Sequence, residues 1–86
     1  DNSIKVELMH CLVEAGRPAE ALETGSRVLS MNPNDAKANF WSGVALSAMG
    51  RNSEALPHFR SAIEVLANAD SGNEILAMAR ERLGRL

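Results

Sequence analysis

The sequence predicts an all-α protein, a right-handed α-solenoid of antiparallel helix hairpins with about five helices in 86 residues. The first observation is a repeat: Gly16-Arg17-Pro18-Ala19-Glu20-Ala21-Leu22 recurs as Gly50-Arg51-Asn52-Ser53-Glu54-Ala55-Leu56. The second is that apolar residues within each unit follow the three-and-four spacing of a helix. The sequence period, the interval from Gly16 to Gly50, is typical of stacked helix pairs.

The repeat extends beyond this motif. When residues 2–35 are aligned with residues 36–69, seven positions are identical, whereas average composition gives about two by chance. We therefore expect a single domain over residues 1–86, with repeats over 2–35 and 36–69 and a closing helix over 71–86. The chain begins with Asp1 rather than Met, so we expect it to be a fragment of a longer protein.

The first repeat is predicted to contain two helices. The first covers residues 3–15, and its predicted buried face consists of Ile4, Leu8, Cys11, Leu12 and Ala15. Gly16 stands where a left-handed C-terminal cap is expected, and Pro18 fits the first turn of the second helix. That helix runs to about Met31 and is expected to bury Ala21, Leu22, Val28 and Leu29. The segment 32–35 ends it, and Asn34 or Asp35 offers the next N-cap.

The second repeat follows the same plan, with helices over 36–49 and about 53–67 joined at Gly50. Pro57 lies beyond the first turn of the latter helix, so it is expected to remove one backbone hydrogen bond or to kink the helix. Ser71 and Glu74 form a capping box for a fifth helix over about 72–85. The apolar stripe of that helix comprises Ile75, Leu76, Ala79, Leu83 and Leu86.

Over residues 2–66 the chain resembles the tetratricopeptide repeat family. The second unit carries the family's small and aromatic residues at Gly43, Gly50, Ala55, Phe59 and Ala62, and the first unit matches at Leu8, Leu12, Gly16, Ala21 and Pro33. The chain departs from the pattern at Gly25, Val28, Asn39, Ser42 and Ala67. We expect Gly43 and the alanines to lie where helices approach most closely, because larger side chains there would force the backbones apart.

The resemblance implies a protein–protein interaction scaffold whose first helices line a concave groove. The groove positions carried over include Val6 and His10 from the first unit and Lys37, Phe40, Trp41 and Val44 from the second. We expect Phe40 and Trp41 to be exposed side by side, which favours an interaction site, because aromatic side chains are enriched at binding hot spots. The alternatives are that the apolar members are semi-buried wall residues and that Trp41 packs against the preceding hairpin.

The partner implied is a protein or a peptide. One subclass of these repeats binds the C-terminal carboxylate of chaperones through Lys, Asn and Arg, but the matching positions here are Val6, His10 and Trp41. A partly apolar groove favours a hydrophobic or amphipathic partner segment instead. The second hypothesis is a structural or self-association module. In that case an open apolar edge near residues 4–15 would pair with a second copy, since two and a half repeats leave one hydrophobic face uncovered.

Other functional classes find no support in the sequence. His10 and Cys11 are adjacent on a helix and so point about 100° apart, and we expect Cys11 to be a buried structural thiol. The two histidines, His10 and His58, have no second ligand at zinc spacing, so we expect no enzyme activity, metal or cofactor. A net charge of −2 and three aromatic residues argue against nucleic acid. No apolar run approaches the roughly 18 residues of a membrane helix, and no signal peptide is evident, so the compartment stays open with a slight preference for the cytoplasm.

Overall fold

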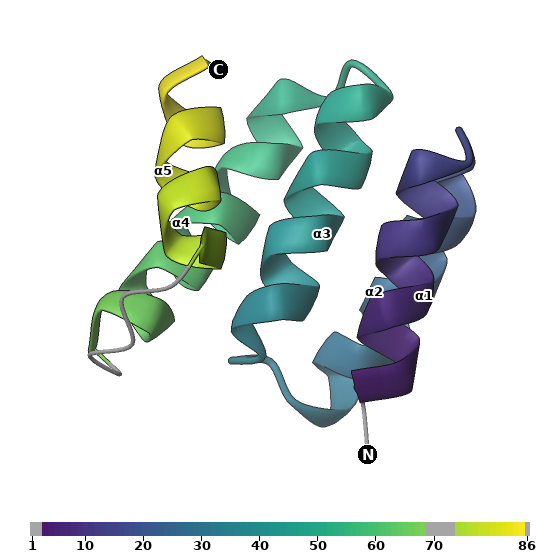
Figure 1. Cartoon of the computed structure of the whole chain (residues 1–86), viewed down its shortest axis with the longest axis horizontal. Helices are drawn as coiled ribbons and strands as arrows, with labels where there is room; N and C mark the ends of the chain where they lie inside the picture. The colour runs from purple at the N-terminus through teal and green to yellow at the C-terminus, as the bar shows by residue number, and fades with distance from the viewer. Residues whose placement is uncertain (1–2, 69–73, 86) are drawn as a thin grey trace.

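The computed structural model describes residues 3–68 and 74–85, which form helices joined by short turns (Figure 1). Five helices lie in these ranges: α1 (Ser3–Glu14), α2 (Pro18–Met31), α3 (Ala36–Ala48), α4 (Asn52–Asn68) and α5 (Glu74–Arg85). α1 and α2 form one antiparallel hairpin, α3 and α4 form the next, and α5 packs on the second hairpin. The predicted all-α hairpin architecture is therefore confirmed, and the boundaries of α1 to α4 agree with the predictions to within about two residues.

The two hairpin turns are built identically, as the repeated motif predicts. Gly16 and Gly50 adopt φ values of 78° and 77°, which residues with a side chain rarely adopt. The backbone N–H of the following arginine then donates to a carbonyl five residues back, from Arg17 to Leu12 and from Arg51 to Leu46, each at 2.8 Å. This is the hydrogen-bond pattern of a Schellman C-cap. The repeated Gly-Arg pair thus ends one helix and turns the chain toward the next.

The same two arginines also form ion pairs at the start of the next helix. The Arg17 guanidinium donates to both carboxylate oxygens of Glu20, at 2.8 and 2.7 Å. Arg51 and Glu54 repeat this arrangement, and their side-chain hydrogen bond lowers the pKa of the Glu54 carboxyl and raises the pKa of Arg51. The shared sequence of the two units therefore consists of turn and helix-start signals.

Hydrogen bonds from partly buried polar side chains fix the segment between the two hairpins. The Asp35 carboxylate accepts a hydrogen bond from the Ala38 backbone N–H at 3.0 Å, which confirms Asp35 as the N-cap of α3. The Asn39 side chain donates from Nδ2 to the carbonyl oxygens of Pro33 and Asp35, at 3.1 and 3.2 Å. Its Oδ1 accepts from Nδ1 of His58 on α4 at 3.0 Å. Asn39 is therefore buried but fully engaged, which explains the polar residue at this position.

α3 is the central helix and packs against the other four. Its residues from Ala38 to Leu46 are all buried. Phe40 lies in the core, with its ring centroid 4.8 Å from Trp41 and 5.9 Å from Phe59. Such all-round burial matches a helix that carries apolar residues on every face.

Each hairpin has one contact where a glycine of one helix accepts a large side chain of the other. In the first hairpin Gly25 is on α2, and a Cβ there would lie 2.6 Å from Cε of Met9 on α1. In the second hairpin Gly43 is on α3, and a Cβ there would lie 2.9 Å from the ring of Phe59 on α4. Met9 and Gly43 occupy equivalent repeat positions, as do Gly25 and Phe59, so the large and small partners have exchanged helices between the repeats. The expected close approach at Gly43 is confirmed, and Met9 fills the space above Gly25.

The structure corrects the predicted face of α1. Val6 and Met9 are buried, whereas Ile4 and Leu8 are 78% and 48% exposed. Cys11 is also exposed, so the prediction of a buried structural thiol is wrong. The cause is that α1 has apolar residues on two sides, and the packing of α2 and α3 selects the side carrying Val6 and Met9.

Two further expectations concern Pro57 and the start of α5. α4 runs unbroken from Asn52 to Asn68 with Pro57 inside it, so no break occurs at the proline. α5 begins at Glu74 among the described residues, and the Ser71 half of the predicted capping box lies outside them.

Candidate functional site: a groove between the first helices

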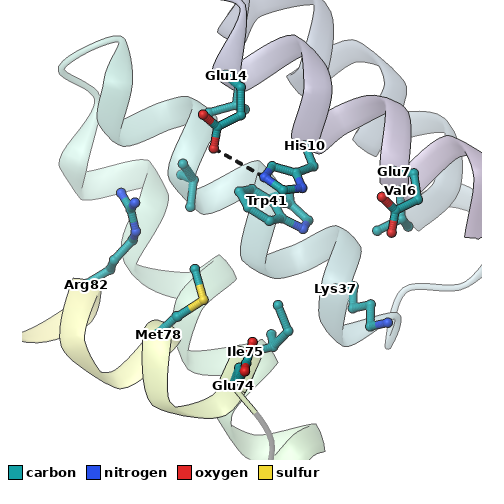
Figure 2. Close-up of a pocket in the computed structure, with 12 residues that line it drawn as sticks. Val6, Glu7, His10, Glu14, Lys37, Trp41, Glu74, Ile75, Met78 and Arg82 are labelled. Carbon is teal, nitrogen blue, oxygen red and sulfur yellow. Dashed lines mark hydrogen bonds and ion pairs between the residues drawn. The ribbon is translucent and has the colours of Figure 1, made fainter.

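A groove runs between α1, α3 and α5, with a cavity volume of about 400 Å³ (Figure 2). α3 forms its floor, and α1 and α5 form its two walls. These are the first helix of each hairpin and the closing helix. The side chains that line it are Val6, Glu7, His10, Val13, Glu14, Lys37, Trp41, Val44, Glu74, Ile75, Met78 and Arg82.

Five of the six groove residues predicted from the sequence meet here: Val6, His10, Lys37, Trp41 and Val44. The sixth, Phe40, does not line the groove, because its side chain is fully buried in the core. The expectation of two exposed aromatic residues is therefore wrong. Successive residues of a helix point about 100° apart, so Phe40 and Trp41 cannot both face the groove.

Trp41 is only 7% exposed because His10 covers it. The imidazole and indole rings stack with their centroids 4.3 Å apart and an angle of 15° between their planes. His10 comes from the preceding hairpin, so the alternative that places Trp41 against that hairpin is confirmed. The Nε2 atom of His10 lies 3.2 Å from the Glu14 carboxylate, and this contact holds the ring over the indole (Figure 2).

α5 supplies a wall of the groove that sequence reasoning left out. Ile75 and Met78 are half-buried and face the groove opposite α1 (Figure 2). The repeat period predicts these two residues, since Ile75 lies one full period after Trp41 and Met78 lies one full period after Val44. α5 thus takes the place of a first helix in a third unit.

Charged side chains of both signs surround the apolar floor. Glu7, Lys37 and Glu74 lie toward the N-terminal ends of the three helices, and Glu14 and Arg82 lie toward the C-terminal ends (Figure 2). Apart from the contact between His10 and Glu14, these side chains form no ion pair in the described part of the chain. The groove therefore combines an apolar centre with charged groups that remain available to a partner.

Two other kinds of site are absent from residues 3–68 and 74–85. No cluster of three or more His, Cys, Asp and Glu residues is arranged there to hold a metal ion. No helix in these ranges is both long enough and apolar enough to cross a membrane.

Comparison with known proteins agrees with the architecture. The family model for the tetratricopeptide repeat matches residues 12–71, which is most of the chain. No curated protein and no solved structure gave a significant match. The matched region contains both glycine turns, the whole of α3 and α4, and the glycine–aromatic contact between Gly43 and Phe59. The chain therefore belongs to the tetratricopeptide repeat family.

Proposed function

We propose that the chain is a protein-interaction module that binds an apolar segment of a partner protein in the groove between α1, α3 and α5. Tetratricopeptide repeats generally mediate protein–protein interaction and are typically non-catalytic. The main support for this proposal is that apolar side chains from three helices line a single groove of about 400 Å³. That volume falls within the roughly 300–1,000 Å³ typical of ligand sites.

The chemistry of the groove indicates the kind of segment it would accept. Val13, Ile75 and Met78 are half-buried and can still lose exposed apolar surface to a partner. Met78 has a flexible side chain that can adapt to different partner shapes. Charged residues at both ends would fix the orientation of the segment. We therefore expect an amphipathic segment with a few apolar anchors and charged residues beside them.

Trp41 and Val44 would contribute differently from the half-buried residues. Both are already buried in the free chain, at 7% and 4% exposure. They form the floor against which the partner packs, so their substitution would disturb the fold as well as the binding. Phe40 is a core residue and no longer belongs to the proposed contact surface.

Matched charge substitutions test this proposal. Met78→Glu places a carboxylate in the groove, and Met31→Glu makes the same change at the end of α2, outside the groove, where Met31 is 72% exposed. Proteins captured from an extract of the source cells by wild type and both variants are identified by mass spectrometry, and the captured protein is then purified. We expect wild type and Met31→Glu to bind it and Met78→Glu to lose at least roughly 10-fold in affinity.

Equal binding of the purified partner by all three proteins would refute the proposal that the groove binds it. Far-UV circular dichroism of each variant would establish that the helices remain intact. Self-association would use a different surface, the outer side of α1, so the two kinds of interaction can be measured separately.

A further inference from the structure

The outer side of α1 carries an apolar stripe that nothing covers in the described part of the chain. It consists of Ile4, Leu8, Cys11 and Ala15, all exposed, at helical spacings of four, three and four residues. We call this set the α1 edge. None of its residues lines the groove, whose apolar α1 residues are Val6 and Val13; His10 and Glu14 lie between the two surfaces.

The internal repeat shows what such a surface does when a neighbour is present. Ile4, Leu8 and Cys11 correspond, one repeat later, to Ala38, Ser42 and Ala45 of α3. All three α3 residues are completely buried, and Ser42 lies against Gly25 of α2. The α1 edge is therefore the first-repeat counterpart of a helix-packing surface, but with larger side chains and without a neighbour.

The other end of the array cannot serve as that neighbour. On α3, Phe40 and Gly43 lie against Phe59 of α4. Their counterparts on α5 are Glu74 and Ala77, both exposed, and Arg80, Glu81 and Gly84 are exposed beside them. The outer side of α5 therefore offers no large apolar side chain and would place Ile4 and Leu8 near the charged Arg80 and Glu81, which disfavours head-to-tail stacking of copies.

The large apolar side chains that are well exposed lie on the α1 edge or near it. Within residues 3–68 and 74–85 the exposed large hydrophobic residues are Ile4, Leu8 and Met31. Met31 ends α2 and lies at the same end of the first hairpin as Ile4, because the two helices are antiparallel. A second copy offers its large exposed apolar side chains on this same surface, which favours an isologous contact about a two-fold axis.

The distribution of side-chain size along the stripe suits such a contact. The large residues, Ile4 and Leu8, occupy the N-terminal half, and the small residues, Cys11 and Ala15, occupy the C-terminal half. Antiparallel pairing of two α1 helices places Ile4 opposite Ala15 and Leu8 opposite Cys11 of the other copy. Large side chains then meet small ones at every position, which permits close packing.

We propose that two copies of this chain associate through their α1 edges to form a two-fold symmetric dimer, leaving both grooves open. The apolar α1 residues of the groove, Val6 and Val13, are not part of the α1 edge, so a dimer could hold two partner segments at once. The proposal rests on a different surface from the groove and stands whether or not the groove binds a partner.

Sedimentation equilibrium of the 86-residue chain tests the proposal directly. We expect a concentration-dependent dimer at concentrations up to roughly 1 mM. Leu8→Glu should weaken it roughly 100-fold, because the symmetry places each substituted residue in the contact twice. Met78→Glu, in the groove, serves as the control and should leave the dissociation constant unchanged. Leu8 is half exposed in one copy, so the variant is expected to keep its helices, which circular dichroism would check.

Cross-linking gives an independent measurement, since Cys11 is the single cysteine of the chain. A short bis-maleimide should join two copies in wild type and in Met78→Glu, but not in Leu8→Glu. A chain that remains monomeric over the whole concentration range would overturn the proposal. The α1 edge would then be a candidate contact surface for a different protein. A dimer that Leu8→Glu does not weaken would overturn it as well.

Discussion

Substituting alanine for Gly43 tests the packing argument on which the second hairpin depends. The new Cβ would lie 2.9 Å from Cε1 of Phe59 and 3.0 Å from two more atoms of the same ring. Carbon atoms in favourable contact are about 3.5–4.0 Å apart, so the ring or the helix must move. Phe59 is fully buried and its ring centroid lies 5.9 Å from that of Phe40, so the ring has little room to retreat.

Two opposing contributions set the size of the effect. Overpacking in a closed core costs about 1–3 kcal/mol, and the tight geometry here places the cost in the upper half of that range. Replacing glycine by alanine inside a helix returns about 1 kcal/mol through helix propensity. We therefore expect Gly43→Ala to lower the free energy of unfolding by about 1–2 kcal/mol, or the melting temperature by several degrees.

Gly84 provides the matched control. It lies in α5, and a Cβ there would meet no atom within 4 Å. Gly84→Ala should therefore stabilise the chain by a few tenths of a kcal/mol, up to about 1 kcal/mol, with propensity acting alone. Urea unfolding followed by far-UV circular dichroism measures both variants against wild type.

A double variant identifies the cause of the loss. Gly43→Ala combined with Phe59→Leu should be destabilised by at least about 1 kcal/mol less than the sum of the two single changes, because the smaller side chain leaves room for the new methyl group. If Gly43→Ala proved as stable as Gly84→Ala, the close contact would not limit the approach of α3 and α4, and the reasoning would be refuted.

Four other predictions concern polar and charged groups. Ser42→Ala should raise the free energy of unfolding by about 1 kcal/mol in a urea titration, since the buried Ser42 hydroxyl has no hydrogen-bond partner in the described part of the chain; a destabilised variant would contradict this. Asn39→Ala should cost about 1–3 kcal/mol by the same measurement, because the Pro33 carbonyl and the His58 Nδ1–H lose their partner, while the Asp35 carbonyl keeps only the backbone N–H of residue 39. Burial lowers the pKa of His58 from 6.5, so the unfolded chain binds the proton more readily and stability should fall as the pH drops below about 6.5; His58→Gln should show a smaller fall between about pH 7.5 and 5.5. Raising the salt from roughly 0.05 to 0.5 M should tighten the proposed dimer, because Glu7 and Glu14 flank the α1 edge on one side and antiparallel pairing brings those sides together; sedimentation at both salt concentrations would decide the sign.

Local sequence signals predicted the helices well because each boundary has its own chemical marker. Gly16 and Gly50 end helices through positive φ, Pro18 begins one, and Asp35 caps another. These signals act within a few residues, so they can be recognised without knowledge of the fold. Pro57 lacks a backbone N–H and was expected to remove one hydrogen bond or to kink the helix, and α4 continues through it.

Burial was harder to predict, because it depends on which neighbours a helix acquires. α1 offers two apolar sides, and nothing within its own sequence selects the one carrying Val6 and Met9. Phe40 was placed in the groove from its repeat position, but α3 is covered on all sides, which its apolar residues on every face could have indicated. The contribution of α5 to the groove follows from the repeat period, whereas the apolar pattern of α5 considered alone does not reveal it.

The exchanged positions of the glycines affect which helices pair with each other while the chain folds. The two hairpins have nearly the same turn sequence. The turns alone therefore do not prevent an incorrect hairpin of α1 with α4, or of α3 with α2. Such a pairing would bring Met9 against Phe59, which is too much volume, or Gly43 against Gly25, which leaves a hole. Duplicated sequences are prone to this kind of mispairing. The reciprocal arrangement of large and small residues thus allows each helix to distinguish its own hairpin partner from the copy.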